Sequence, residues 1–176
     1  MSPRRSDRGA LLLEVAVYAA VLGGLALAFL AAFDAAARVE RHALLDGASR
    51  AEADRLHEIV AADLAAASAA TLEMPAPGER AQAVRFRRVI DVATDGATGV
   101  PYPVLEAEPV DFSFGPRGLV RRQGGQEVLI SPRVVAFEVE RPGGGRPLAL
   151  GLRIGVDLGG PDGAAAVEGR VLVPND

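Results

Sequence analysis

The spacing of hydrophobic residues changes twice along the chain. Residues 10–33 are almost continuously apolar, residues 34–74 are apolar at every third or fourth position, and residues 79–176 are apolar at every second position in several segments. These spacings are typical of a membrane-spanning helix, an amphipathic helix and half-buried strands, respectively. Because the helical pattern comes first and the strands follow without alternating with helices, the sequence predicts an α+β fold.

The apolar segment 10–33 predicts a single transmembrane helix. A helix of this length spans roughly 36 Å, which exceeds the hydrocarbon core of about 30 Å. Arg4, Arg5 and Arg8 precede the segment. Because basic flanks stay in the cytoplasm, we expect a single-pass protein with a cytoplasmic N-terminus and an external body. A cleaved secretory signal and a plain membrane anchor are alternatives, but neither explains the carboxylate of Glu14 inside the segment.

Apolar residues within 45–67 recur at helical steps and define one stripe of the amphipathic region. They are Leu45, Ala48, Leu56, Ile59, Val60, Leu64 and Ala67. Because no proline interrupts this region, the sequence predicts one continuous helix over residues 10–73. Pro75, Pro77 and Gly78 then end it.

Beyond Gly78, apolar and polar residues alternate in short segments. The clearest alternation covers 110–114, 135–139, 148–156 and 167–173, and a less regular segment covers 83–92. The apolar residues expected to face inward are Val110, Phe112, Phe114, Val135, Phe137, Val139, Leu148, Leu150, Leu152, Ile154, Val156, Val167, Val171 and Val173. Glycine-rich turns separate the segments. The pattern therefore predicts an antiparallel sheet meander whose apolar face covers the stripe of the helix.

Glu14 is the unusual residue of the apolar segment. A carboxylate in a membrane helix costs on the order of 2.5–3.5 kcal/mol, and such groups are usually paired and functional. The sequence around it, RGALLLEV over residues 8–15, resembles the processing site of type IV pilins and type II secretion pseudopilins. In that family a short basic leader ends in glycine, the fifth residue after the glycine is glutamate, and a long apolar helix follows.

The resemblance implies a role for three residues. A prepilin peptidase would cleave between Gly9 and Ala10 on the cytoplasmic side, and the new α-amine of Ala10 would be methylated. Ala10 stands where the family usually has phenylalanine. Glu14 would pair with the amine of a neighbouring subunit in a filament. The chain would then comprise a cleaved leader (1–9), a transmembrane helix half (10–33), an amphipathic helix half (34–74) and a globular β domain (79–176).

The order of the strand residues also resembles one subgroup, the J-class minor pseudopilins. The residues concerned are Phe112-Ser113-Phe114, the segment 118–122, the segment 128–130 and Val134-Val135-Ala136-Phe137. The resemblance implies a structural subunit of a type II secretion pseudopilus in the inner membrane. Its partners would be other minor and major pseudopilins, the prepilin peptidase, the inner-membrane assembly platform and membrane lipid. A minor pilin of a type IV pilus and a signal-anchored extracytoplasmic β-domain that binds a ligand are the alternatives.

The composition argues against several kinds of chemical site and of partner. There is no cysteine, which excludes disulfides and thiolate metal sites, and which differs from many type IV pilins, whose C-terminal loop is closed by a disulfide. All 19 basic residues are arginine. The net charge of −4, with the basic excess confined to the leader, argues against a nucleic-acid partner.

The sequence also lacks the marks of an enzyme. No nucleophile elbow, P-loop, dinucleotide-binding glycine motif or zinc-protease motif is present, so we expect neither catalysis nor a cofactor. His42 and His57 are about four helical turns apart, too far to share a metal, and are expected to face solvent or a partner. Asp54 and Glu58 are expected on a solvated helix face.

Two groups of charged residues in the body have less definite roles. Loop carboxylates at Asp91, Asp95 and Asp162 do not show the ligand spacing of a calcium site. The strand arginines form a solvated outer face or a docking surface for acidic partners. They are Arg85, Arg87, Arg88, Arg121 and Arg122.

Overall fold

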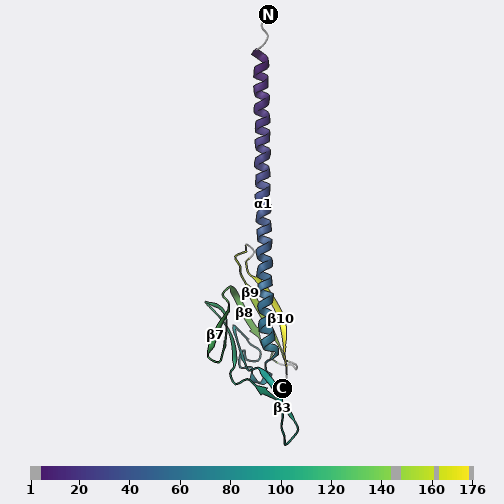
Figure 1. Ribbon diagram of the computed structural model, residues 1–176, viewed down its shortest axis with the longest axis vertical. Helices are drawn as coiled ribbons and strands as arrows, with labels where there is room; N and C mark the ends of the chain where they lie inside the picture. The colour runs from purple at the N-terminus through teal and green to yellow at the C-terminus, as the bar shows by residue number, and fades with distance from the viewer. Residues whose placement is uncertain (1–4, 144–147, 161–162, 175–176) are drawn as a thin grey trace. The chain divides into compact units, whose positions relative to one another are not determined.

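The computed structural model describes residues 5–143, 148–160 and 163–174, and side chains from residue 11 onward. These residues form one long helix, one short 3-10 helix and ten strands (Figure 1). The chain divides into two compact units, residues 1–44 and residues 45–176, and each unit is considered by itself.

The helix α1 (Arg5–Ala65) begins in the first unit and ends in the second. Every side chain between residues 11 and 44 is exposed. In the second unit Ala53, Leu56, Val60 and Leu64 are buried at steps of three and four residues. Leu56, Val60 and Leu64 belong to the apolar stripe that the sequence predicts, whereas Ala53 is buried without being part of that prediction.

The stripe differs from the prediction at its first turn. Ala48 is exposed, whereas the neighbouring Ser49 is buried. The hydroxyl of Ser49 accepts a hydrogen bond from the backbone N–H of Leu158 at 3.3 Å. A buried hydroxyl needs such a partner, so this contact fixes which face of the helix turns toward the body.

The helix also ends earlier than the prediction, at Ala65 instead of residue 73. The segment after Ala65 pairs with a strand instead of continuing the helix. Ser68 donates its backbone N–H to the carbonyl of Arg87 at 3.0 Å, and Glu73 donates to the carbonyl of Arg85 at 2.9 Å. Because these groups find partners in the body, tertiary pairing outweighs the helix propensity of the alanines here.

The remaining elements are short. They are η1 (Ala69–Thr71), β1 (Arg80–Ala81), β2 (Ala83–Phe86), β3 (Val89–Thr94), β4 (Pro101–Leu105), β5 (Val110–Gly115), β6 (Gly118–Gln123), β7 (Gln126–Ser131), β8 (Val134–Glu140), β9 (Leu148–Val156) and β10 (Ala165–Val173). The predicted strand over 83–92 is divided into β2 and β3, which belong to different sheets.

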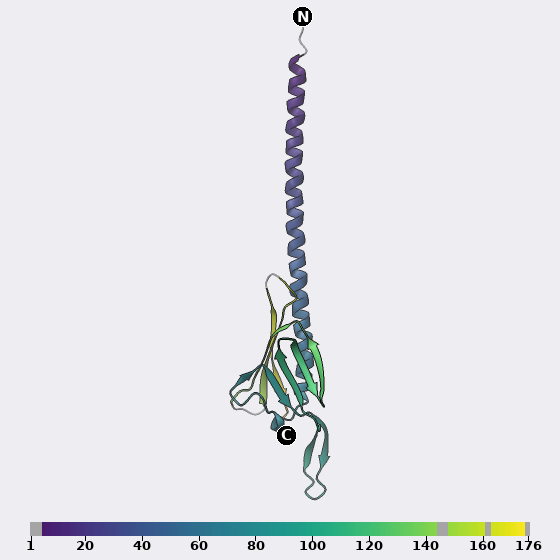
Figure 2. The same ribbon diagram turned by 90° about the vertical axis from the view of Figure 1, so that its left-hand side faces the viewer.

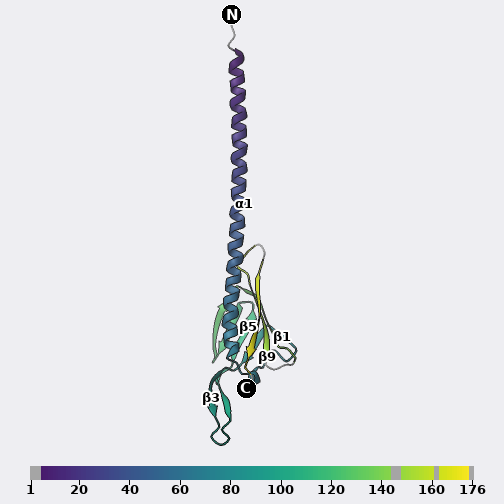
Figure 3. The same cartoon turned by 90° about the vertical axis from the view of Figure 1, so that its right-hand side faces the viewer.

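All strand pairs are antiparallel, and the α+β class is confirmed. Two four-stranded sheets have the orders β1-β8-β9-β10 and β2-β5-β6-β7. Each contains a three-stranded meander, β8-β9-β10 in one and β5-β6-β7 in the other. The hairpin β3–β4 forms a separate two-stranded sheet that extends from one end of the body (Figure 2 and Figure 3).

One core joins the helix to both four-stranded sheets. Leu56 and Leu64 of α1, Phe112 of β5 and Phe137 of β8 are among its largest fully buried side chains. The inward residues of β9 from position 150 to position 156 are buried as predicted. Every residue that the structure describes as buried lies in the second unit, so the body has its own hydrophobic core without any contribution from residues 11–44.

The start of β8 departs from the predicted alternation. Val135 is expected to face inward with Phe137 and Val139, but Val135 is 49% exposed and Val134 is buried. The pairing with β9 shifts register between Val134 and Ala136. Such a bulge places two residues opposite one and reverses the inward face, so the prediction for Val135 is wrong.

Candidate functional site

The three residues of the predicted processing and assembly site lie near the N-terminal end of α1. Gly9 and Ala10 have helical backbone, and Glu14 follows one turn after Ala10. The side chain of Glu14 is exposed, and in the described part of the chain it makes no ion pair or hydrogen bond. No residue that the structure describes therefore occupies this carboxylate.

The helix around Glu14 is long and apolar enough to cross a membrane. No break occurs at Gly23 or Gly24, which are both helical. A Cβ added at either glycine would meet nothing within 4 Å. The two glycines therefore serve no close contact inside this chain, although each weakens the helix by about 1 kcal/mol relative to alanine.

Small residues recur at every fourth position of this segment. They are Ala16, Ala20, Gly24, Ala28 and Ala32. Residues four apart lie on neighbouring turns, and their direction drifts by about 40° per step. A row of small residues lets the backbone of a second helix approach closely. Alanine is abundant throughout the segment, so the spacing is the only sequence signal that reveals this row.

In the body, partly buried ion pairs connect the end of α1 to the sheets. Asp63 of α1 contacts Arg88 through Oδ1 at 3.2 Å and Arg121 of β6 through Oδ2 at 2.8 Å. Arg88 also holds Glu106 through two hydrogen bonds of 2.9 and 3.1 Å. The Arg121 guanidinium lies 5.9 Å from the ring centroid of Phe112, within the range of a cation–π contact.

Two members of this cluster, Glu106 and Arg88, have shifted pKa values. Hydrogen bonds from Arg88 lower the pKa of Glu106 below its usual range, and partial burial opposes them. The hydrogen bond to Glu106 in turn raises the pKa of Arg88. A carboxylate with a lowered pKa is ionised at neutral pH and is a weak base, so Glu106 is poorly suited to accept a proton in catalysis.

The strand arginines do not form one outer basic face. Arg88 and Arg121 are turned toward Asp63 of the helix. Arg122 pairs with Glu127 at 2.8 Å on the surface, and Arg85 pairs with Glu73 at 3.4 Å. Among the described residues, only Arg87 of this group makes no ion pair. These arginines therefore contribute mainly to the body's own ion pairs.

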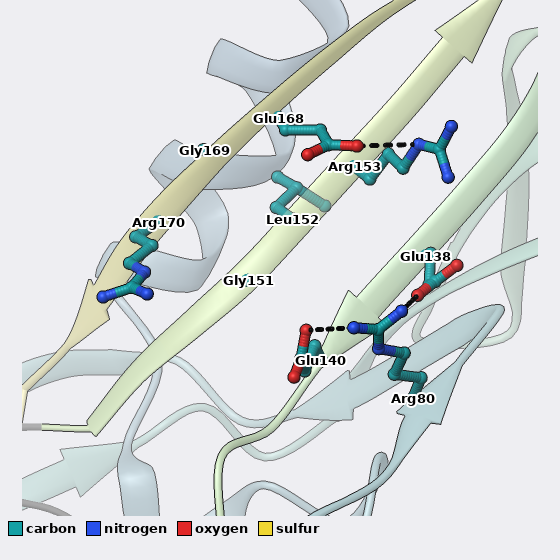
Figure 4. A pocket seen from close by; sticks show the side chains of 9 residues that line it. All are labelled: Arg80, Glu138, Glu140, Gly151, Leu152, Arg153, Glu168, Gly169 and Arg170. Atoms are coloured by element: carbon teal, nitrogen blue, oxygen red, sulfur yellow. Dashed lines mark ion pairs between the residues drawn. The ribbon is translucent and has the colours of Figure 1, made fainter.

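The outer face of the sheet β1-β8-β9-β10 carries a groove of about 360 Å³ (Figure 4). Arg80 pairs with Glu138 at 3.2 Å and with Glu140 at 3.1 Å on one wall. Arg153 pairs with Glu168 at 3.0 Å further along the same face. The groove is thus lined by charges of both signs, most of which already have partners.

At Gly151 no side chain covers the floor of the groove. This residue pairs with Glu140 on one side and with Arg170 on the other, and it places no side chain between them. Arg170 is exposed and makes no ion pair with any residue that the structure describes. The groove offers one guanidinium for a carboxylate, and it has neither a nucleophile nor a histidine for catalysis.

The two histidines of α1 have different surroundings. His42 is exposed, as predicted. His57 is half-buried, and its Nε2 is covered without a hydrogen-bond partner. The covering element is β10, because a Cβ at Gly169 would lie only 2.5 Å from that Nε2. The prediction that His57 faces solvent or a partner is therefore wrong, whereas Asp54 and Glu58 are exposed as predicted.

Asp91 and Asp95 do not gather with other described residues into a metal site. No group of three or more metal-ligating side chains occurs in the residues that the structure describes, and Asp162 lies outside them. Asp95 instead accepts a hydrogen bond from the backbone N–H of Ala97 at 2.8 Å, which lowers the pKa of Asp95. This carboxylate therefore stabilises the tip of the β3–β4 hairpin.

No protein-family model, curated protein or solved structure matches the chain. The fold itself is consistent with a pilin-like protein, because a long apolar N-terminal helix continues into a stripe that packs on antiparallel sheets. The helix is also compatible with single-pass membrane anchoring.

Proposed function

We propose that the chain is a minor pseudopilin, a structural subunit of the pseudopilus of a type II secretion system. The observation that carries this proposal is the surroundings of Glu14. One carboxylate, five residues after Gly9, lies on an uninterrupted helix whose neighbouring apolar side chains are all exposed. A plain anchor gains nothing from this carboxylate, whereas a filament subunit can use it as a pairing site.

Cleavage between Gly9 and Ala10 would supply the partner charge. The peptidase removes the leader and leaves an α-amine at Ala10, which is positively charged at neutral pH. In the assembled filament, the amine of one subunit would meet Glu14 of the next. Opposite charges attract strongly at low dielectric, and a single buried pair fixes register more than it adds stability.

The small residues of the span would allow the helices to approach. Without water there is no hydrophobic force between membrane helices, so association depends on close packing. The row that includes Ala20 and Gly24 drifts around the helix by about 40° per step. A winding row can face more than one neighbour, as a subunit of a helical filament requires.

The remaining surfaces would serve the other contacts of a minor subunit. The leader and Ala10 would face the prepilin peptidase in the cytoplasm, and residues 10–33 would lie in the inner membrane beside lipid and the assembly platform. The body would lie in the periplasm and contact other minor and major pseudopilins. Its acidic, ion-paired surface suits specific protein contacts better than nucleic acid.

The N-terminus of the mature chain tests this proposal. The full chain is co-expressed with a prepilin peptidase, and its N-terminus is determined by mass spectrometry. The proposal predicts a chain that starts at Ala10, and a Gly9→Val variant that stays uncleaved. A start after Ala37, where a signal peptidase would find small residues, contradicts the proposal. An intact Met1 beside active peptidase contradicts it equally.

A further inference from the structure

The strand β10 leaves one edge of its sheet without a backbone partner. It is the outer strand of the sheet β1-β8-β9-β10, and its nine residues pair with β9 without a bulge. Among the described residues, no backbone group of β10 forms a hydrogen bond with any segment other than β9. An unpaired edge of this kind is a template for a further strand.

The other outer strands that the structure describes are protected from such pairing. β1 has only two residues, and β4 contains Pro101 and Pro103, which have no N–H to donate. β3 and β7 each have a bulge, because Ile90 and Ile130 have no residue opposite them. The edge of β2 is covered by residues 67–74, which bridge to it and donate backbone N–H groups. β10 has neither a bulge, a proline nor a covering segment among the described residues.

The register of the sheet shows which residues of β10 point their backbone groups outward. Successive residues of a strand point their N–H and C=O groups to opposite edges. Arg141, just after β8, donates its N–H to the residue that precedes β1, at 3.0 Å, so Glu140 points to β9 and to its partner Gly151. The next residue of β9 therefore points to β10, where Gly169 faces it. The outward groups belong to the alternate residues Ala166, Glu168, Arg170 and Leu172.

One of these four residues also has an unpaired charge. Glu168 is bound to Arg153 of β9 at 3.0 Å. Arg170 lies opposite Gly151 of β9 (Figure 4), which has no side chain to pair with it, and Arg170 makes no ion pair with a described residue. A strand added at the open edge would place a side chain directly opposite Arg170, with the two Cβ atoms about 5 Å apart. A carboxylate at that position would neutralise the guanidinium.

We propose that β10 binds an extended strand of another protein, and that a carboxylate of this strand pairs with Arg170. Leu172 lies two residues further along the same face and is 62% exposed. The bound strand would therefore carry an apolar side chain two residues from its carboxylate. Backbone hydrogen bonds would supply the affinity and these two side chains the specificity. This mode of binding does not depend on the proposed function.

A second copy of the chain is a poorer occupant than a strand of another protein. Two β10 strands that pair antiparallel around Gly169 would place Glu168 of each copy opposite Arg170 of the other. The symmetry of this pairing reverses the direction of everything packed on the sheet, including the end of α1, which belongs to the same core. The two helices would run in opposite directions, which excludes this pairing for two chains anchored in one membrane by their N-terminal helices.

Amide hydrogen exchange tests the open edge with a defined probe. The probe is a short synthetic peptide with a central glutamate, a valine two residues away on either side, and threonine elsewhere. It is added to the ¹⁵N-labelled full chain in detergent micelles, and NMR measures the exchange of the β10 amides. At a peptide concentration ten times Kd, exchange of the outward amides at positions 166, 168, 170 and 172 should slow about 10-fold. The amides at 167, 169 and 171 bond to β9 and are the internal control.

The charge pair is tested by exchanging the two charges. A second peptide has arginine in place of the glutamate. Wild type should bind the glutamate peptide about 2-fold to 30-fold more tightly, because opposite charges across strands attract and like charges repel. Arg170→Glu should invert this preference. Arg87→Glu is the matched control, because Arg87 is also an exposed arginine without an ion pair among the described residues, and it should leave the preference unchanged.

Each of the contrary results has a definite meaning. If the glutamate peptide leaves the outward amides of β10 unchanged, Arg170 blocks the edge instead of binding a partner, and the proposal is wrong. If Arg87→Glu changes the preference as much as Arg170→Glu, the attraction is unspecific and the pairing with Arg170 is wrong. If the outward amides become protected without peptide as the concentration of the chain rises, a second copy occupies the edge, which also overturns the proposal.

Discussion

Apolar side chains are exposed in the first unit of the chain and mostly buried in a core in the second. In residues 11–44, every large apolar side chain is exposed. In residues 45–176, helix and sheets bury the apolar side chains in one core. One continuous helix serves both units. The difference teaches that the second unit has a core of its own, whereas the described part of the first has none and is compatible with membrane anchoring.

The largest expected effect comes from matched aromatic truncations in the two units. Phe112→Ala removes a fully buried ring and should lower the free energy of unfolding of the body by about 3–5 kcal/mol. Phe29→Ala removes a ring that is 75% exposed and should change it by less than about 0.5 kcal/mol. Urea unfolding of the detergent-solubilised chain, followed by the circular dichroism of the sheets, measures both. Equal effects would remove the distinction between the units.

An intermediate effect is expected from two matched glycine substitutions. Gly169→Ala drives a methyl group against His57 and should cost about 1–3 kcal/mol, the usual range for overpacking. Gly24→Ala meets nothing within 4 Å and should leave the stability of the body unchanged. Thermal unfolding measures both variants.

A double variant identifies the cause of the Gly169 effect. His57→Ala removes the ring that the new methyl group meets, so Gly169→Ala should cost much less in that background. If the two substitutions are simply additive, the close approach of His57 to β10 is not the reason for the glycine.

The smallest expected effect is the pH dependence of one ion pair. Because Arg88 lowers the pKa of Glu106 in the folded protein, the pair contributes its full stability above the unfolded pKa of about 4.3. The contribution is lost as the pH falls through the lowered folded value. For a partly exposed pair it amounts to about 0.5–1 kcal/mol. Wild type and Glu106→Gln should therefore differ in stability at pH 7 and converge below pH 4. A constant difference across this range contradicts the ion-pair account.

Local patterns in the sequence identify most of the elements. The helix, the strands and their inward faces follow from hydrophobic spacing, because burial on one face imposes a period of 3.6 or 2 residues. The predictions are wrong where contacts with distant segments determine the local structure. The helix ends at Ala65 because the next residues pair with the strand near Arg87, and Val135 faces outward because β9 forces a bulge.

The same contrast between local and distant residues applies to the candidate site. Gly9, Ala10 and Glu14 are visible in the sequence because their spacing along one helix is local. Contacts between distant residues carry no such signal. Asp63 meets Arg121 across 58 positions, and His57 meets Gly169 because the sheet passes over the helix. Neither spacing nor composition indicates these pairs.

The pairing of Glu14 with a neighbour's amine is the central claim, and the composition allows a direct test. The chain has no lysine, so after cleavage the α-amine of Ala10, methylated or not, is the only amine of the chain that an activated carboxylate can acylate. The processed chain, assembled with its partner subunits, is treated with a membrane-permeant carbodiimide, which joins an amine to a contacting carboxylate. The account predicts an amide bond between Glu14 and the N-terminal amine of another subunit, absent in Glu14→Gln. Assembled complexes in which Glu14 stays unlinked, while the amine of Ala10 links elsewhere, would contradict it.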